Sequence, residues 1–175
     1  MPTLLNPMLR SWPIWALLTS AAMLAIAHAF QTFGGLAPCT LCLQQRDVYW
    51  VAMAVAALAV AATWTPARER LSPLFVLLLV GVFAAGAAIA ARHAGAEWKW
   101  WPGPETCSGG GAHTVTAAAL KQLMQGAKIT APRCDVAAWR FLGLSMAGWN
   151  FLISVGLAAL SFMAWLRIRR PEASR

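Results

Sequence analysis

Long stretches of this chain carry hydrophobic residues and no charge. Three such windows, Val48–Ala67, Leu71–Ala91 and Phe141–Leu166, each reach about 20 residues, the length of helix that crosses roughly 30 Å of hydrocarbon. A fourth charge-free stretch runs from Ser11 to Gln45, and its apolar part ends before the Gly34-Gly35 pair, which favours a helix end there. The pattern predicts four membrane-spanning helices.

The predicted fold is an all-α membrane protein, a four-transmembrane-helix bundle with the whole chain, residues 1–175, as one membrane domain. The expected helices and outer loops have these approximate bounds: helices 12–33, 47–65, 71–91 and 143–166, with a short outer loop at 34–46 and a long one at 92–142. Within the long loop, residues 114–125 are good helix formers with apolar side chains on one face. We expect an amphipathic helix on the membrane surface there, with a solvated linker as the alternative.

Composition supports a membrane protein and excludes a soluble globule. Hydrophobic residues make up 59% of the 175 residues and charged residues only 11%. The first apolar segment could instead be a secretory signal, because Arg10 precedes it and small residues near 25–29 resemble a cleavage site. Its apolar stretch exceeds the usual signal core of about 7 to 15 residues, so a membrane span is favoured.

The distribution of basic residues predicts the orientation of the helices. Arginines crowd into the short segments beside helix ends on the side of the two termini, whereas the basic residues of the long loop are spread out. The positive-inside rule therefore predicts cytoplasmic termini and places both cysteine-bearing loops on the outer side. These anchoring arginines account for much of the net charge of +8, so we expect contact with membrane lipid and no binding of nucleic acid.

Four cysteines carry the candidate chemistry. Cys39 and Cys42 form a Cys-x-x-Cys motif in the short outer loop, and Cys107 and Cys134 lie in the long one. Two cysteines at this spacing can close a small, reducible ring, and a helix N-terminus or a nearby cation favours the thiolate that performs exchange. The outer compartment is oxidising, which lets disulfides persist.

Three hypotheses compete for these cysteines: structural disulfides, a metal site, or a relay of redox-active pairs. A zinc site usually has a second short-spaced pair of ligands, which the chain lacks, so we expect no metal. A bridge between Cys39 and Cys42 would constrain only four residues and add little stability, which argues against a purely structural role.

Arg46 favours the redox hypothesis. If a helix begins near Cys42, the i, i+4 spacing places Arg46 on the same face as Cys42 and one turn closer to the membrane. A cation there can stabilise a Cys42 thiolate and can donate a hydrogen bond to a carbonyl oxygen of an acceptor dissolved in the membrane. The alternative is an arginine that reaches to the interface and pairs with Asp47.

These features together resemble the DsbB family of disulfide bond formation proteins, and the resemblance covers nearly the whole chain. Its carriers are Pro38-Cys39-Thr40-Leu41-Cys42, Arg46 four residues later, Cys107 and Cys134 in the long loop, and the Cys134-Asp135 dipeptide. The run Trp139-Arg140-Phe141-Leu142-Gly143-Leu144-Ser145-Met146 then leads into the last helix. The order of these elements is more specific than any one of them.

The resemblance implies an inner-membrane disulfide oxidoreductase of bacteria, with periplasmic cysteine loops. It would reoxidise a periplasmic, thioredoxin-fold partner of the DsbA type and pass the electrons to a quinone, ubiquinone or menaquinone. By resemblance, Cys107 and Cys134 exchange with the partner, while Cys39 and Cys42 form the pair nearest the quinone and Cys42 meets it. Arg46 would contact the quinone.

His93 lies near the position of a quinone-side histidine in that family, although its surroundings match less well, and an ordinary interfacial histidine is the alternative. His28 lies inside the first predicted span, where a helix contact is the simpler role. Two other functions stay open. One is a quinone/thiol oxidoreductase similar to vitamin K epoxide reductase, in which the quinone-side pair lies at the last helix of the bundle. The other is a non-catalytic membrane protein with structural disulfides.

Overall fold

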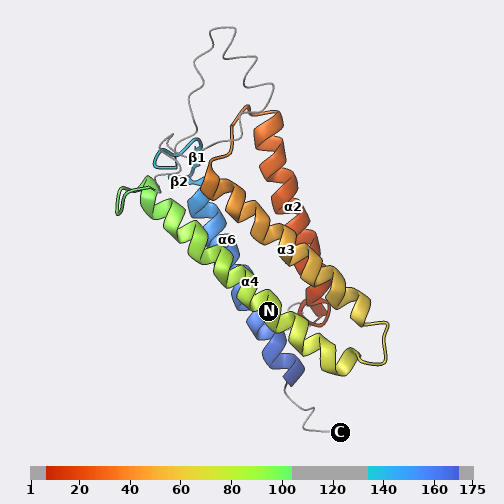
Figure 1. Cartoon of the computed structure of the whole chain (residues 1–175). Coiled ribbons are helices and arrows are strands. Elements are labelled where there is room, and N and C mark those ends of the chain that lie inside the picture. Colours follow the sequence, from red (N-terminus) through yellow and green to blue (C-terminus); the bar gives the residue numbers. More distant parts are fainter. Residues whose placement is uncertain (1–6, 104–133, 170–175) are drawn as a thin grey trace.

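The computed structural model describes residues 7–103 and 134–169, and nearly all of them lie in helices. Four long helices form an elongated bundle: α2 (Trp12–Thr32), α3 (Thr40–Ala62), α4 (Arg68–Glu97) and α6 (Met146–Arg169) (Figure 1). A short antiparallel hairpin of β1 (Arg140–Phe141) and β2 (Leu144–Ser145) precedes α6. The chain runs up and down along the bundle, so the start of α3 and the end of α4 lie at the same end (Figure 1).

Small residues line the contacts between the helices. α4 packs most extensively along α6 and α3, and α3 packs against α2. Alanines such as Ala52 and Ala56 are buried where the helices meet. At Gly86, a Cβ atom would lie only 2.9 Å from Cγ1 of Val48, so α3 and α4 approach more closely than any larger residue would allow. Such close approach is how membrane helices gain packing energy, because lipid provides no hydrophobic force between them.

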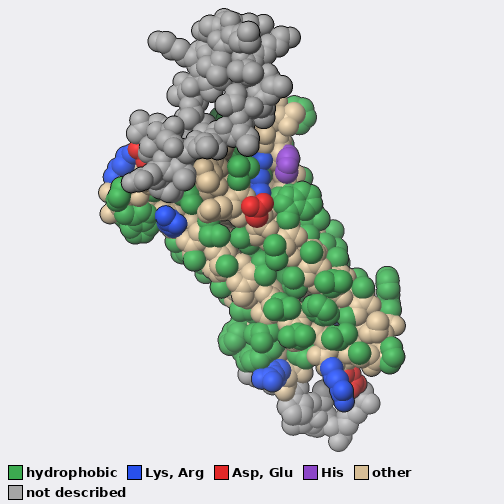
Figure 2. Space-filling view, in the orientation of Figure 1, with side chains coloured by type: hydrophobic (Ala, Val, Ile, Leu, Met, Phe, Trp, Pro, Cys, Tyr) green, Lys and Arg blue, Asp and Glu red, His purple; other side chains and the backbone are tan. Residues whose placement is uncertain are grey.

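The hydrophobic pattern is confirmed as that of a membrane protein. Three described helices, α2, α4 and α6, are long and apolar enough to cross a membrane. Leucines and other large apolar side chains face outward along them, and Figure 2 shows a hydrophobic band between charged side chains at the two ends. α3, whose first two turns carry Gln44–Asp47, is not among these three.

The predicted bounds of α2 are right. At the end of the bundle that holds the cysteines, the predicted bounds of the other three helices are wrong. α3 begins at Thr40 rather than at residue 47, and α4 continues to Glu97 rather than ending at 91. A gap between charges marks the apolar core of a span, but the backbone hydrogen bonds of a helix continue past it into polar sequence. The expected loop 34–46 is therefore shorter than predicted, and the expected loop 92–142 begins only after Glu97. The amphipathic helix expected at 114–125 lies outside the described residues.

The start of α6 is also displaced, from the expected residue 143 to Met146, because residues 140–145 form the hairpin. Its turn places Leu142 at φ 51° and Gly143 at φ 82°, the left-handed backbone that a two-residue hairpin turn requires. Trp149 donates a hydrogen bond from Nε1 to the Phe141 carbonyl at 3.0 Å. The Trp139 ring, just before β1, lies 5.2 Å from that of Phe30 on α2. The hairpin thereby connects the outer ends of α2 and α6.

One buried hydrogen bond joins the start of α2 to α6. It leads to a prediction about the stability of the protein. Trp12 Nε1 donates to Ser161 Oγ at 2.9 Å, and both side chains are buried. Ser161→Ala should lower the stability of the detergent-solubilised protein by about 1 kcal/mol, because it leaves the indole N–H without an acceptor. Thermal unfolding followed by circular dichroism would measure the change.

Ser20→Ala is the matched control for that substitution. Ser20 is also fully buried, but its Oγ has no hydrogen-bond partner among the described residues. Removing this hydroxyl should leave the stability unchanged or raise it slightly. Equal losses in the two variants would show that the bond between Trp12 and Ser161 contributes nothing.

Candidate functional site

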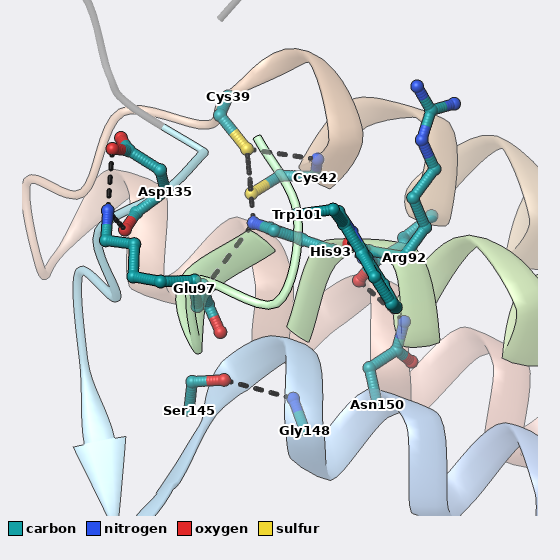
Figure 3. A network of polar contacts seen from close by, with 12 residues as sticks. Cys39, Cys42, Arg92, His93, Glu97, Trp101, Asp135, Ser145, Gly148 and Asn150 are labelled. Carbon is teal, nitrogen blue, oxygen red and sulfur yellow. Dashed lines mark hydrogen bonds and ion pairs between the residues drawn. The ribbon is translucent and has the colours of Figure 1, made fainter. Parts of the chain in front are cut away.

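The Cys-x-x-Cys motif caps the first turn of α3. Cys39 is the N-cap residue, and its Sγ accepts a hydrogen bond from the backbone N–H of Cys42 at 3.3 Å. The two sulfur atoms lie 2.8 Å apart, and both cysteines carry free thiols (Figure 3). Because a helix N-terminus concentrates partial positive charge, this position favours a thiolate in the first turn.

The two sulfurs differ in environment. Cys39 is buried, and its hydrogen bond to Cys42, together with that burial, raises the pKa of its thiol above the ordinary value. The proton of the pair therefore stays on Cys39. Cys42 is only half-buried and lines a cavity, so it is the sulfur that presents a reactive electron pair to a bound molecule.

The cavity beside Cys42 is mostly apolar, with a volume of about 140 Å³. Its apolar wall comes from the outer half of α2, from the connection to α3, from the segment before β1 and from the start of α6: Met23, Ile26, Ala27, Phe30, Leu36, Ala37, Pro38, Ala138, Met146 and Ala147. A few polar side chains converge on it: Gln45, Arg46, Tyr49, His93 and Asn150. An apolar wall with few convergent polar groups is typical of a site for a small hydrophobic molecule.

A chain of buried polar side chains runs from Cys39 across three helices. His93 Nε2 on α4 lies 3.7 Å from Cys39 Sγ, and its Nδ1 lies 3.0 Å from Gln45 Nε2 on α3. Gln45 Oε1 accepts a hydrogen bond from Asn150 Nδ2 on α6 at 2.7 Å, and the Tyr49 hydroxyl donates to Asn150 Oδ1. The chain fixes the His93 ring so that Nε2 faces the sulfurs (Figure 3).

Glu97 adds a buried carboxyl group to this cluster. It lies one helical turn beyond His93 on α4, with its Oε1 3.7 Å from His93 Nε2. Both side chains are more than nine-tenths buried. The cluster therefore holds two thiols, an imidazole and a carboxyl group, and the sulfurs of Cys39 and Cys42 lie with His93 as a possible metal-ligand set.

Arg46 lies where the sequence predicts, on α3 one turn beyond Cys42, and it lines the cavity. Its guanidinium donates to the Ala27 carbonyl at 3.0 Å and to the Gln31 side chain, both on α2. The described residues show no ion pair between Arg46 and Asp47, so the alternative of such a pair is wrong. Arg46 connects α2 to α3 and keeps a positive charge at the cavity.

Cys134 is held next to the Cys-x-x-Cys pair. It is fully buried, is disulfide-bonded, and packs with Cys39 and Leu41 in one cluster. The neighbouring Asp135 accepts hydrogen bonds from Lys99, which follows α4, through its carbonyl and its carboxylate, each at 2.7 Å. This ion pair fastens the segment after the long loop to the end of α4. Cys107 lies outside the described residues.

The two described histidines have different surroundings. His93 belongs to the cluster and also lines the cavity, whereas the Nδ1 of His28 lies 2.8 Å from the Leu24 carbonyl of its own helix and does not line the cavity. The structure thus places Cys39, Cys42, Arg46, His93 and Cys134 together. Sequence reasoning missed four members of the site: Gln45, Tyr49, Glu97 and Asn150. Of these four, Asn150 could have been found from the sequence, because it is an isolated polar residue within an apolar span.

Comparison with known proteins agrees with this arrangement. The family model "Disulfide bond formation protein DsbB" matches residues 9–164. Disulfide bond formation protein B of Methylococcus capsulatus is 34% identical over 94% of this chain and 98% of its own length. Disulfide bond formation protein B 2 of Pseudomonas entomophila is 32% identical over 90% of each chain, and the protein of Albidiferax ferrireducens is 31% identical over 87% of this chain and 86% of its own. The chain, with its membrane helices and clustered cysteines, belongs to the DsbB family of disulfide bond formation proteins.

Proposed function

We propose that this chain is a thiol oxidase that takes electrons from a periplasmic, thioredoxin-fold partner of the DsbA type and passes them to a membrane quinone. One observation carries the proposal. Cys39 packs beside Cys134, which follows the long loop, while Cys42 lines an apolar cavity within the helices. The Cys39–Cys42 pair thus stands between a site for thiol exchange and a site for a lipid-soluble acceptor.

The cavity suits a quinone, ubiquinone or menaquinone. Its apolar wall matches a hydrophobic ring and tail, and the side chains of Arg46 and His93 offer hydrogen-bond donors for carbonyl oxygens. A bound quinone would take up the two electrons and two protons that the Cys39–Cys42 dithiol loses on oxidation. The roles of the protein are to present the Cys42 sulfur, to keep the positive charge of Arg46 beside it, and to exclude water.

Thiol–disulfide exchange accounts for the electron route. A thiolate of the partner attacks Cys107 of a Cys107–Cys134 disulfide, and the released Cys134 thiolate attacks Cys39 of the oxidised Cys39–Cys42 pair. The second thiol of the partner then frees Cys107, leaving the partner oxidised. Cys107 in turn attacks Cys134 and restores the loop disulfide, which releases Cys39 and Cys42 as a dithiol. Each step breaks one disulfide and forms one, so the electrons end on the pair beside the cavity.

The position of Cys134 supports the middle step of this route. Exchange requires the attacking and the attacked sulfur to meet, and Cys134 already packs in the same buried cluster as Cys39. The hydrogen bonds between Lys99 and Asp135 hold it there. Little movement of this end of the long loop is needed.

The orientation in the membrane follows from the two ends of the bundle. We infer that α3 is the fourth membrane span, because it runs the length of the bundle between α2 and α4 (Figure 1). Arg10, Arg68 and Arg167 line one hollow at the end opposite the cysteines. The positive-inside rule assigns that end, and with it both termini, to the cytoplasm of a bacterial inner membrane, with the cysteines on the periplasmic side.

The chain belongs to the DsbB family, which argues against the alternative of a vitamin K epoxide reductase-like protein. The remaining alternative is a non-catalytic protein with structural disulfides. It is disfavoured by the free Cys39 and Cys42 thiols at a cavity, where a structural bridge would serve no purpose. Turnover separates the two: purified protein should reduce quinone with a reduced thioredoxin-fold partner as electron donor.

Removing one cysteine from either pair should stop turnover, and the two variants should trap different intermediates. Cys42→Ser should accumulate a bridge between Cys39 and Cys134, because these sulfurs share one cluster and the resolving thiol is gone. Cys134→Ser leaves no loop disulfide for a reduced partner to open, but its Cys107 thiolate can attack the disulfide of the oxidised partner and should accumulate bonded to it. Non-reducing gels with peptide mapping would identify both species, and normal quinone reduction by either variant would favour structural disulfides.

Arg46→Ala should raise the KM for quinone by about tenfold or more, since it removes a charged hydrogen-bond donor from the cavity. The rate of disulfide exchange with the partner should change little. Arg46→Lys should recover part of the loss, because a single ammonium group does not reproduce the guanidinium fork. Steady-state kinetics with varied quinone would measure the effect.

Gln31→Ala separates this role from a structural one, since it removes a contact of Arg46 with α2 but keeps the charge. An equal rise of KM in Gln31→Ala and Arg46→Ala would show that Arg46 acts only by joining the helices.

The orientation can be tested with two exposed tryptophans, which are more accessible to a label than the buried Cys39 and Cys134. In a variant with all four cysteines replaced by serine, Trp100→Cys after α4 should react with an impermeant maleimide on intact spheroplasts. Trp64→Cys, between α3 and α4, should react only after permeabilisation. The reverse pattern would contradict the proposed orientation.

A further inference from the structure

The spacing of the cysteines predicts no metal site, but the fold brings His93 to the Cys39–Cys42 pair, and we propose that the reduced protein binds a zinc ion through Cys39, Cys42, His93 and Glu97. The first three residues bring two Sγ atoms and one imidazole nitrogen within 4.8 Å of one another. Two thiolates, an imidazole and a carboxylate are ligands that zinc takes in tetrahedral sites. This inference stands independently of the quinone, because it concerns only the reduced Cys39–Cys42 pair and its neighbours.

The distances from His93 Nε2 to Cys39 and to Glu97 already approach those of a tetrahedral site. With Zn–S bonds near 2.3 Å and Zn–N and Zn–O bonds near 2.1 Å, neighbouring ligand atoms lie roughly 3.4 to 3.8 Å apart. His93 Nε2 lies 3.7 Å from Cys39 Sγ and 3.7 Å from Glu97 Oε1. The two sulfurs, 2.8 Å apart, are too close. Glu97 is not among the three residues whose donor atoms all lie within 4.8 Å of one another, so its carboxyl group would have to turn toward the sulfurs. Two thiolates no longer share a proton and repel each other, so a small rotation of the half-buried Cys42 would bring them to the required spacing.

Glu97 provides the second, independent sign of a cation site. Its Oε2 atom is buried and has no hydrogen-bond partner among the described residues. Ser145 and Arg140 also interact with this carboxyl group, but they leave Oε2 without a hydrogen bond. Burying a carboxylate oxygen without a partner is costly, and a proton or a bound cation relieves that cost. The other oxygen faces His93, the central donor of the set (Figure 3).

The surrounding polar chain supports a ligand role for His93. A metal-bound histidine usually donates its second N–H to an oxygen, and Nδ1 of His93 lies beside the Gln45 amide. Rotation of the Gln45 and Asn150 amides by a half turn exchanges their donors and acceptors without moving the chain. The Tyr49 hydroxyl can then donate to Ser154 Oγ, which lies 3.4 Å away. Nε2 is left free to bind the ion.

The redox state of the pair controls the site. Zinc displaces one proton from each thiol and forms two Zn–S bonds, whereas a Cys39–Cys42 disulfide offers no thiolate. Cys134 packs nearby but is disulfide-bonded, so it provides no ligand. Bound zinc would hold the pair as a dithiolate and keep it from forming a disulfide, so the ion acts as an inhibitor that captures the reduced enzyme.

The test uses the full-length protein in lipid nanodiscs, with Cys107→Ser and Cys134→Ser so that only the Cys39–Cys42 pair can be reduced. After anaerobic reduction with a phosphine, cobalt(II) should bind in one equivalent. Its spectrum should show intense visible bands of tetrahedral cobalt and sulfur-to-cobalt charge transfer, and zinc should abolish both. The same protein reoxidised to the disulfide should show neither band.

Glu97→Gln and His93→Ala should each weaken cobalt binding by about tenfold or more, since loss of a direct ligand should cost at least as much as loss of a supporting group. Glu69→Gln and His28→Ala are the matched controls, because both residues lie outside the cluster and should leave affinity unchanged. Circular dichroism would verify that each variant is helical. Absence of cobalt binding by the reduced protein, or equal affinity in wild type and both ligand variants, would overturn the site.

Discussion

The buried hydrogen bonds that join His93, Gln45, Asn150 and Tyr49 are the constraint on which the site depends. Hydrocarbon offers no water to a polar side chain, so each of these groups must find its partner on another helix. Gln45 lies on α3, His93 on α4 and Asn150 on α6, and a shift of any helix by one residue would leave donors and acceptors unpaired. The chain thereby fixes the register of the helices at the level of Cys39.

This register gives the two sulfurs of one short motif different neighbours. Cys39, as the N-cap of α3, faces Cys134 and His93, whereas Cys42, one turn later, faces the cavity. In the proposed function, a pair that passes electrons from a protein thiol to a membrane-soluble acceptor needs this division, because the donor and the acceptor arrive from different phases. The N-terminus of a helix at the membrane boundary provides it without further structure.

Three of the predicted membrane helices are found as long apolar helices, because charge-free windows mark them in the sequence. The sequence also predicted that Arg46 lies near Cys42, because the i+4 spacing places both on one face of a helix. It did not predict the start of α3 at Thr40 or the end of α4 at Glu97. A helix can continue into polar sequence where other parts of the fold provide hydrogen-bond partners for the polar side chains. Gln45 and Glu97 were missed for the same reason. Their role comes from facing His93 across or along helices, which spacing in one segment does not reveal.

Arg46 shows how one side chain can serve both the fold and the site. At this depth a guanidinium needs partners for its donors, and the Ala27 carbonyl and Gln31 near the end of α2 accept two of them. These contacts fasten α2, which forms much of the cavity wall, to the turn of α3 that follows Cys42. The wall, the positive charge and the Cys42 sulfur are therefore held as one unit. A displacement of α2 would alter the shape of the cavity and the electrostatic environment of the thiolate together.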